Sequence, residues 1–405
     1  MIRITSLGGS GEDSRNCFLI ESDEANILLD CGVRREIADT ATVYPALSRE
    51  IAEKLNAVVI SHGHEDHTAA LPYLYELGYR GKIYASLKTI EVIPGYLRKW
   101  IRYVRDHEGT LPFDEENVEK LEYETIENYP FPIEYGRSGH MIGSLWYLFT
   151  LEGHRILYTG DLTYDGMVLK ADKLPLMDTL IIDSAYASRS LSQYNQYLNL
   201  LNVARDTVSD GGMVLLPVPA NGRGIDLFLY LSLRDLPVFA EENIVRNTED
   251  LKNHLYWLRD PEIQPGEYYL INNENRQAIL EEGIPGVYLF ADGMMTSAIS
   301  PLYFNAVKDS EKNIILITGH TARGTMANDL LSVLYRDENN ISCRVAPLTI
   351  KVHPDEEDVE TIIGFVKPHN VILFHSRREK AQELKKKLEE KGLRVICGPE
   401  EPLII

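Results

Sequence analysis

The chain has 405 residues, enough for two domains, and its 44% hydrophobic and 25% charged residues are ordinary for a globular protein. A formal net charge of -20 argues against a general nucleic-acid coat protein, but not against a nuclease, because metal ions and a few local cations can hold a phosphate. No apolar run approaches the ~20 residues that span a bilayer, and the N-terminus lacks a signal-peptide layout. The four cysteines form no Cys-x-x-Cys pair, so we expect neither a disulfide framework nor a thiolate zinc site, and a reducing cytoplasm fits best.

The first 32 residues predict strands around a glycine-rich turn. Leu7-Gly8-Gly9-Ser10-Gly11 supplies the turn, and the apolar runs at 17–20 and 26–29 are typical of short strands. The second run ends at Asp30, which precedes Cys31 and Gly32. An Asp at this place can point into a site at the sheet edge or can be a plain turn residue, and the local sequence leaves both open.

The stretch Ser61-His62-Gly63-His64-Glu65-Asp66-His67 follows an apolar run at 57–60 that is typical of a buried strand. It contains the pattern His-x-His-x-Asp-His, and imidazoles with an interleaved carboxylate suit zinc or a similar divalent ion. Alternating ligands in an extended loop point in different directions, which serves two adjacent ions better than one. A solvated polar turn is disfavoured, because three of the 11 histidines fall within six positions.

The segment after this loop repeats one pattern, an apolar strand followed by Asp or His. Helices are expected at 68–77 and 87–108, and His140 then precedes strands at 145–151 and 156–159. Asp161 follows the second of these strands, and Asp183 follows an apolar run at 179–182. This arrangement gathers ligands along one edge of a sheet. Taken singly, His140 is more often a structural histidine, and an Asp after Gly is more often a turn.

From about residue 186 the pattern changes to alternating helix and strand. A helix at 191–209 and strands at 213–217, 287–290 and 314–317 predict an α/β unit with a mostly parallel sheet. Glycine-rich turns at 220–224, 292–296 and 318–324 could cradle phosphates through backbone N–H groups, although each is explained as well by a tight turn. None is a P-loop.

The last segment adds two histidines. His353 precedes a helix at 356–366, and His375 ends an apolar strand at 371–374. Each alone is more often structural than catalytic. The strongly charged helix at 377–391 is expected to be a solvated face.

These motifs together resemble a known family. The ordered set of Asp30, the His62–His67 loop, His140 and Asp161 is similar to the metallo-β-lactamase superfamily. The long α/β segment before His375 resembles its β-CASP nuclease branch, which includes ribonuclease J and the cleavage-and-polyadenylation endonuclease. In that branch Asp183, His353 and His375 match three further motifs, and RNA-directed members carry His at the third.

The resemblance covers the whole chain and implies its fold. It implies an α/β protein in which a metallo-β-lactamase αββα sandwich, formed by residues 1–185 and 346–405, carries an inserted α/β domain. That inserted β-CASP domain is expected at 186–345, with a mostly parallel sheet.

The resemblance also implies two divalent ions, zinc or else manganese, and a division of roles. One ion would be held by His62, His64 and His140, the second by Asp66, His67 and His375, with Asp161 between them. Water activated by the two ions would hydrolyse RNA phosphodiester bonds. His353 would be the general acid, oriented by Asp183, and Asp66 is also expected in the catalytic set. Asp30 would fix a ligand histidine without touching the ion. Because ligand histidines must be neutral, activity should fall at acid pH.

Single-stranded RNA is the partner that the resemblance implies, with no membrane and with a homodimer as a common arrangement in the family. Arg223 and Arg323, on glycine-rich turns, are the expected phosphate contacts. The chain departs from the family at Lys351, before His353, at Ser376, and at Asp292, where an acid would repel a phosphate. A competing hypothesis is therefore a metallo-hydrolase of a small ester, thioester or lactone. A non-catalytic RNA-processing subunit is disfavoured, because no expected ligand is missing.

Overall fold

The computed structural model describes residues 1–35, 39–187, 189–398 and 402–405. The chain forms two compact units. The first contains Met1–Tyr164, Leu169–Ser190 and His353–Ile405, and the second contains Asp165–Val168 and Leu191–Val352. The borders expected from the sequence, at 185/186 and 345/346, stand a few residues before those of the units. All of the expected metal ligands belong to the first unit.

The first unit has two sheets. Within the described residues, one sheet has seven strands in the order β21-β1-β3-β4-β5-β6-β7. Strands β4 to β7 run parallel to one another, and β21, β1 and β3 complete the sheet with antiparallel pairs. The strands are β1 (Arg3–Gly8), β3 (Cys17–Glu21), β4 (Asn26–Leu29), β5 (Ala57–Val59), β6 (Ile83–Ala85), β7 (Tyr123–Thr125) and β21 (Leu403–Ile404).

The second sheet of this unit has the order β20-β18-β11-β10-β9-β8. Its strands β20, β18, β11 and β10 are parallel, and β9 and β8 are antiparallel. They are β8 (Ile133–Arg137), β9 (Leu145–Leu151), β10 (His154–Tyr158), β11 (Thr179–Asp183), β18 (Asn370–Phe374) and β20 (Arg394–Ile396). A short pair, β2 (Ser10–Gly11) with β19 (Ser376–Arg377), joins the N-terminal turn to the residues that follow His375.

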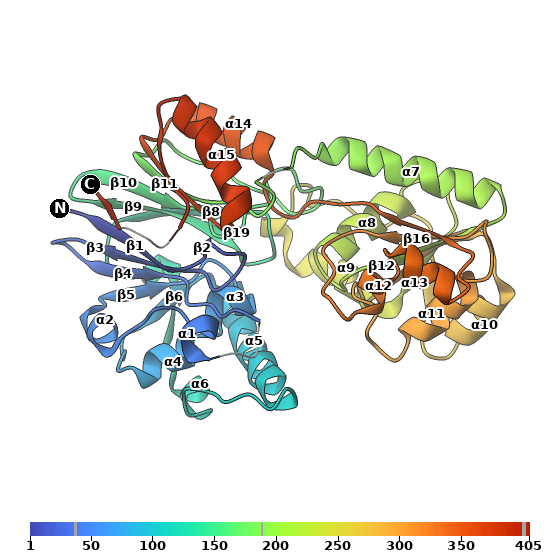
Figure 1. Ribbon diagram of the computed structural model, residues 1–405, viewed down its shortest axis with the longest axis horizontal. Coiled ribbons are helices and arrows are strands. Elements are labelled where there is room, and N and C mark those ends of the chain that lie inside the picture. The colour runs from blue at the N-terminus through green and yellow to red at the C-terminus, as the bar shows by residue number, and fades with distance from the viewer. Residues whose placement is uncertain (36–38, 188, 399–401) are drawn as a thin grey trace. The chain divides into compact units, whose positions relative to one another are not determined.

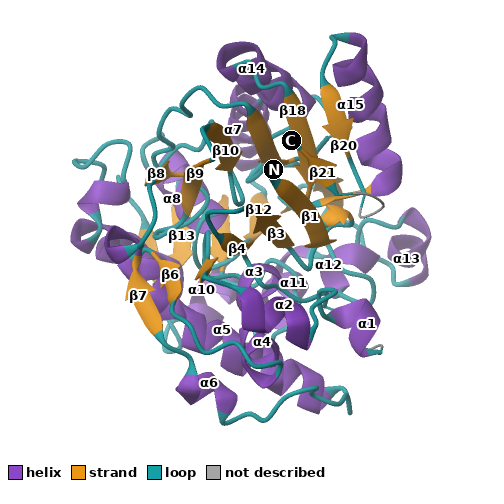
Figure 2. Ribbon diagram, turned by 90° about the vertical axis from the view of Figure 1, so that its left-hand side faces the viewer, coloured by secondary structure: helices purple, strands orange, loops and turns teal. Residues whose placement is uncertain are grey.

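The two sheets pack face to face with helices outside them. Phe18 of β3 contacts Tyr158 of β10 and Phe374 of β18, so aromatic rings fill the space between the sheets. Figures 1 and 2 show helices on both sides of this pair. The helices on the seven-stranded sheet are α2 (Arg49–Lys54), α4 (Leu71–Glu76), α5 (Leu87–Asp106) and α6 (Asn117–Lys120), and those on the other sheet are α14 (Glu356–Val366) and α15 (Arg378–Glu390). The predicted αββα sandwich is confirmed.

The second unit has one sheet, in the order β14-β13-β15-β12-β16-β17, and its pairs are all parallel within the described residues. Val214 and Leu216 of β12 face one core while Leu215 faces the other, as the alternation of a strand requires. The mostly parallel sheet is thus confirmed. Its strands are β12 (Met213–Pro217), β13 (Val238–Glu241), β14 (Tyr269–Ile271), β15 (Gly286–Phe290), β16 (Ile314–Ile317) and β17 (Arg344–Pro347).

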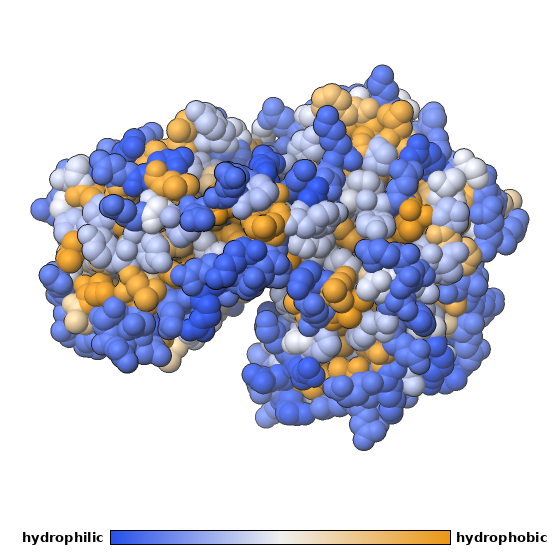
Figure 3. All heavy atoms as spheres, turned by 180° about the vertical axis from the view of Figure 1, so that it is seen from behind, coloured by the Kyte–Doolittle hydropathy of each residue, from blue (hydrophilic) through white to orange (hydrophobic). Residues whose placement is uncertain are grey.

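Helices cover both faces of that sheet. One face carries α7 (Gln193–Ser209), α8 (Arg223–Ser232) and α9 (Glu242–Glu249), and the other carries α10 (Arg276–Glu282), α11 (Ser300–Val307) and α12 (Met326–Asp329). The remaining helices are α1 (Thr40–Val43), α3 (Glu65–Thr68) and α13 (Val333–Glu338), whose Tyr335 packs against the second of these cores. Short 3-10 turns lie at Ile126–Asn128, Asp250–Asn253 and Leu255–Trp257. In the part of the chain that the structure describes, no helix is long and apolar enough to cross a membrane. Figure 3 shows a mostly hydrophilic face with scattered apolar side chains.

One predicted helix is wrong in its bounds. The sequence predicts one helix at 68–77, whereas α3 covers Glu65–Thr68 and α4 begins only at Leu71. Pro72 lies in the first turn of α4, where its missing N–H costs no helical hydrogen bond, so a second helix starts there. The last three residues of the histidine loop, Glu65, Asp66 and His67, lie on the helical turn α3.

The second unit contains a partly buried acid, Asp226, whose charge should affect stability. Burial raises the pKa of Asp226 to about 7, although Arg223 and Arg259 oppose the shift. The pKa of an aspartate in the unfolded chain is near 4, so the folded state holds this proton more tightly than the unfolded state. Its contribution to the free energy of unfolding is complete below pH 4 and is lost as the pH rises through about 7. We expect hydrogen exchange at β12, corrected for the intrinsic rate, to show lower protection at pH 8 than at pH 5.

Asp226→Asn should remove most of that difference. Asp206→Asn, at an exposed acid of α7, is the matched control and should keep it. An unchanged pH dependence in the Asp226 variant would contradict this account.

Candidate metal centre

The histidine loop is held by close backbone packing. A Cβ on Gly32 would lie 1.6 Å from the carbonyl oxygen of Asp66, and a Cβ on Gly63 would lie 2.5 Å from Cγ2 of Val92. Only glycine fits at both places. The loop is thereby pressed between the end of β4 and the helix α5, which fixes the direction of its side chains.

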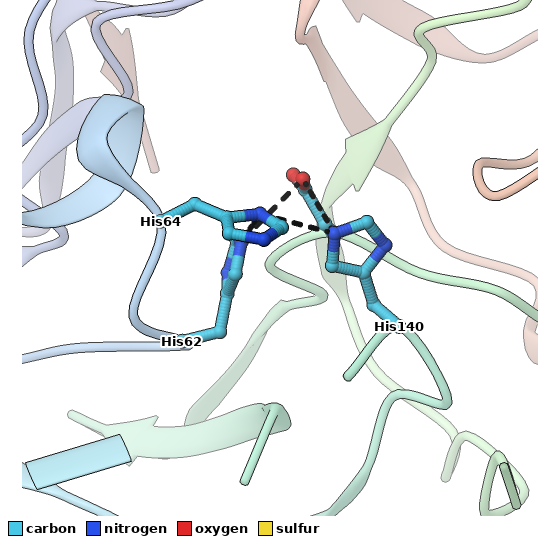
Figure 4. Close-up of side chains that lie close together, drawn as sticks. His62, His64 and His140 are labelled. Carbon is cyan, nitrogen blue, oxygen red and sulfur yellow. Dashed lines mark hydrogen bonds and ion pairs between the residues drawn. The ribbon is translucent and has the colours of Figure 1, made fainter. Parts of the chain in front are cut away.

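Three histidines from two loops converge on one point. His62 Nε2 lies 3.0 Å from His64 Nδ1, and His140 Nε2 lies 3.3 Å from the same atom. Figure 4 shows the three rings turned toward one another. An oxygen of Asp161 lies 3.5 Å from both His62 Nε2 and His140 Nε2 and completes the set.

A second group lies on the other side of Asp161. His375 Nε2 is 3.2 Å from Asp66 Oδ2, and His67 Nε2 is 3.7 Å from the same oxygen. Asp161 Oδ1 is 3.1 Å from His67 Nε2, while its Oδ2 is 3.6 Å from His375 Nε2. Asp161, at 2% exposure, therefore faces both groups.

These donors fit divalent cations. Zinc binds imidazole nitrogen and carboxylate oxygen at about 2.0–2.2 Å, so ligands of one ion lie about 3–3.6 Å apart, as these atoms do. The four atoms of the first group and the three of the second each lie within 4.8 Å of one another. Without a cation, nitrogen lone pairs and carboxylate oxygens would face one another at these distances, which is costly in a buried place.

The pKa shifts follow from the same crowding. Burial, and then neighbouring His67, lower the pKa of His62 well below its usual value. Burial opposes the ionisation of Asp161, but His375 and His67 outweigh it and hold the pKa of that carboxyl well below its usual value. Asp161 and Asp66 overcome the burial of His375 and raise its pKa to about 10. The site thus combines ionised acids with histidines that compensate them, and a divalent ion would take over that compensation.

Asp30 orients one ligand. It has a φ of 54° at the end of β4, and it accepts hydrogen bonds at 2.6 Å from Ser61 N and at 2.5 Å from the Tyr158 hydroxyl. Its Oδ2 lies 2.6 Å from His67 Nδ1. A proton on Nδ1 is favoured by this contact, and Nε2 of His67 is then left with its lone pair toward Asp161.

Asn16 is a buried contact that the sequence interpretation missed. Its Nδ2 lies 2.8 Å from His67 Nε2, and its backbone N–H donates to the Asp66 carbonyl at 2.8 Å. The same turn fixes a ligand from the far end of the chain, since the Gly9 carbonyl accepts from His375 N at 2.9 Å. In the sequence, Asn16 is only a polar residue directly before the apolar run at 17–20, which does not indicate a contact with a metal ligand.

His353 lies beside the cluster with an acid behind it. Its Nδ1 is 2.8 Å from Asp183 Oδ2 and 3.9 Å from Asp161 Oδ2, and its ring centroid is 4.8 Å from that of His375. Asp183 is fully buried and also accepts from Leu162 N at 3.0 Å. The ring of His353 is therefore held from one nitrogen, and its other nitrogen is left for a different partner.

The expected phosphate contacts belong to the second unit. Arg223 begins α8, and its guanidinium lies against Gly319, where a Cβ would be 2.2 Å from Nη2. Arg323 is exposed on the turn at 318–324. Of the departures from the family, Asp292 is engaged in its own loop, where it accepts from Ser297 N and Ser300 Oγ at 2.6 Å each. Lys351 Nζ lies 3.2 Å from Asp165 Oδ2.

Comparison with known proteins accounts for nearly the whole chain. Three family models match: the metallo-beta-lactamase superfamily over residues 10–207, the Beta-Casp domain over 169–330, and the Zn-dependent metallo-hydrolase RNA specificity domain over 339–399. The chain belongs to the β-CASP nuclease branch of the metallo-β-lactamase superfamily. It is accordingly a metal-dependent hydrolase, and the donor set described above fits the divalent ions of such an enzyme.

Curated relatives of this β-CASP protein carry several names. Transcription termination factor FttA of Methanothermobacter thermautotrophicus is 25% identical over 94% of this chain and 68% of its own length. An RNase J-like protein of Methanocaldococcus jannaschii is 26% identical over 93% of both chains. Endoribonuclease ysh1 of Schizosaccharomyces pombe is 25% identical over 96% of this chain and 56% of its own. A solved structure, a protein of unknown function from Enterococcus faecalis, shares the fold with a TM-score of 0.63 at 15% identity over the whole of both chains.

Asp30→Asn tests how far the metal centre depends on the orientation of His67. Asparagine tolerates the positive φ at this position, but its amide cannot accept as strongly from Ser61, Tyr158 and His67 together. We expect zinc affinity, measured by competition with a chromophoric chelator, to fall about 10- to 100-fold. Asp178→Asn, at a partly exposed acid outside the cluster, should leave the affinity unchanged. Equal affinities in the two variants would contradict the role of Asp30.

Proposed function

We propose that this protein is a ribonuclease that hydrolyses phosphodiester bonds with two divalent ions, zinc or else manganese, and with His353 as general acid. The observation that carries the proposal is the His353–Asp183 pair, 2.8 Å apart, beside the cluster of His and Asp donors. Support for RNA as the substrate comes from the match to an RNA specificity domain and from relatives named as RNase J-like protein and endoribonuclease.

Each group of side chains has a defined task in this mechanism. His62, His64 and His140 would hold one ion and Asp66, His67 and His375 the other, and Asp161 faces both groups. When bound, the ions lower the pKa of a water and neutralise phosphoryl oxygens. Asp30 keeps Nε2 of His67 unprotonated and directed toward the centre.

His353 and Asp183 handle the leaving group. Asp183 holds Nδ1 of His353, so the proton to be given away is carried on Nε2. Protonation of the departing ribose oxygen from that atom avoids the release of an alkoxide. Asp183 stays in place during this transfer, because the Leu162 and Ala185 N–H groups each donate to it at 3.0 Å.

The small-ester hypothesis loses one of its supports. It rested partly on Asp292, an acid that would repel a phosphate in its turn. The carboxylate of Asp292 accepts two hydrogen bonds from its own loop, and these lower its pKa although burial opposes the shift. A charge engaged in this way is a structural part of the turn, and it is weak evidence for a change of substrate class.

His353→Ala tests the proposed chemistry on a single-stranded RNA labelled at either end, with zinc or manganese supplied. Loss of the general acid should lower kcat by about 10²- to 10⁴-fold, while zinc binding stays at the wild-type level. The product ladder separates internal cleavage from cleavage at the 5′ end. His369→Ala, at a histidine whose side chain is 82% exposed, is the control and should cleave like the wild type.

A wild-type protein that is loaded with metal and leaves RNA intact would contradict the ribonuclease proposal. In that case turnover of a panel of esters, thioesters and lactones would be measured next. Cleavage that persists unchanged in His353→Ala would instead contradict only the assignment of the general acid.

A further inference from the structure

One face of α5 runs outward from the metal centre and carries rings and cations in alternation. Its N-terminal end is attached to the loop of His140, since the Ser86 and Thr89 hydroxyls donate to the Gly143 carbonyl at 2.6 and 2.9 Å. Two turns further, Tyr96 packs edge-on against His64, with ring centroids 5.5 Å apart. The helix is therefore in direct contact with both loops that carry the first ligand group.

Beyond Tyr96 the same face continues with paired cations and tyrosines. Lys99 Nζ lies 4.6 Å from the centroid of the Tyr96 ring, and Arg35 Cζ lies 4.7 Å from that of Tyr103. Tyr96, Lys99 and Tyr103 are spaced by three and four residues, so they form one stripe that is about 10 Å long at 1.5 Å per residue. We call these three residues and Arg35 the α5 strip.

The cations of the α5 strip differ from two other cations of the helix, Arg98 and Arg105, whereas exposed Arg102 likewise has no carboxylate within ion-pair distance among the described residues. Arg98 and Arg105 point away from the strip by helical geometry, and acids engage them, Glu119 at 3.4 Å and Glu115 at 2.8 Å. Among the residues that the structure describes, no carboxylate lies within ion-pair distance of Lys99, which is exposed. Arg35 is 65% exposed in its side chain, and its only described acidic neighbour is Glu65, at 3.8 Å.

We propose that the α5 strip binds the single-stranded RNA on one side of the cleaved bond. The proposal rests on the ribonuclease function proposed above and names where the strand runs on the first unit. Trp100 already stacks on Tyr103, with ring centroids 5.6 Å apart, so the two exposed cations held over the tyrosine rings carry the proposal. Lys99 and Arg35 would contact phosphates, which holds a strand without regard to its sequence. In a chain of net charge -20, two exposed cations beside a metal centre complement a polyanion, although Glu65 lies 3.8 Å from one of them, Arg35.

The double variant Arg35→Ala with Lys99→Ala tests the proposal, with Arg98→Ala together with Arg105→Ala as the matched control on the same helix. Binding of fluorescent oligoribonucleotides with cleavage-resistant phosphorothioate linkages is measured by anisotropy on the zinc-loaded protein, so the readout does not depend on cleavage. We expect the strip variant to bind a 20-mer about tenfold more weakly. The slope of log affinity against log salt should fall by about 1.4, because each phosphate contact of a single strand contributes ~0.7. Lys99→Glu, which changes the charge by two at one exposed side chain, should weaken binding by a similar factor.

Cleavage of RNAs lengthened stepwise on the 5′ or the 3′ side then locates the strip. In the wild type and in the control, kcat/KM should rise when one of the two extensions reaches the strip, and this rise should be lost in the strip variant. Zinc content is measured in every variant to show that the histidine loop is intact. Equal binding and equal length dependence in the strip variant and the control would overturn the proposal. Strip-dependent binding by a protein that does not cleave RNA would support the strip and contradict the ribonuclease function.

Discussion

The structure depends on the burial of several ionisable side chains around Asp161. Burying carboxylates and imidazoles costs free energy unless opposite charge compensates them. Here the two ligand groups share one carboxylate that is 2% exposed, and histidines on both sides lower its pKa against the effect of burial. A cluster of this kind is stable only if cations, as protons or as metal ions, occupy it. The stability of the first unit therefore depends on charge compensation in this cluster as well as on the burial of its apolar cores.

The two sheets bring the ligands together from distant parts of the chain. The carboxyl ends of parallel strands meet at one edge of a sheet, and β5, β10, β11 and β18 each deliver a functional residue just beyond that end. The turn before β3 adds the backbone contacts that fix Asp66 and His375. The order of the strands thus brings the ligands of the metal centre together. The long inserted unit separates β11 from β18 in sequence, but these two strands are neighbours in the sheet.

Much of this could be predicted from the sequence, for a physical reason. The donors of the histidine loop are close in sequence, and an apolar strand before them is a local signal, so their place at a strand end could be inferred. The strand-then-acid pattern likewise predicted Asp161 and Asp183. The partners of these residues could not be found in this way. Asn16, Tyr158 and the Gly9 carbonyl reach the ligands only through tertiary packing, and a lone polar residue beside an apolar run is no signal of its own. The break between α3 and α4 was missed because the apolar pattern predicts one continuous helix. Pro72 instead lies in the first turn of a new helix, where proline is well accommodated.

The charge of the chain illustrates why totals say little about a site. A net charge of -20 suggests repulsion of nucleic acid, yet the strength of that repulsion at a given place depends on charges within about a Debye length, near 8–10 Å at physiological salt. Within such a distance of His64 stand Lys99, on the ring of Tyr96, and also the carboxylates of Asp66 and Asp161, which bound cations would compensate. Glu119 and Glu115 engage Arg98 and Arg105 on another side of the helix. The acidic surface can thus keep the protein soluble and repel strands that approach elsewhere. A local cationic path then selects where a strand is held, which is the arrangement that an acidic enzyme with a polyanionic substrate requires.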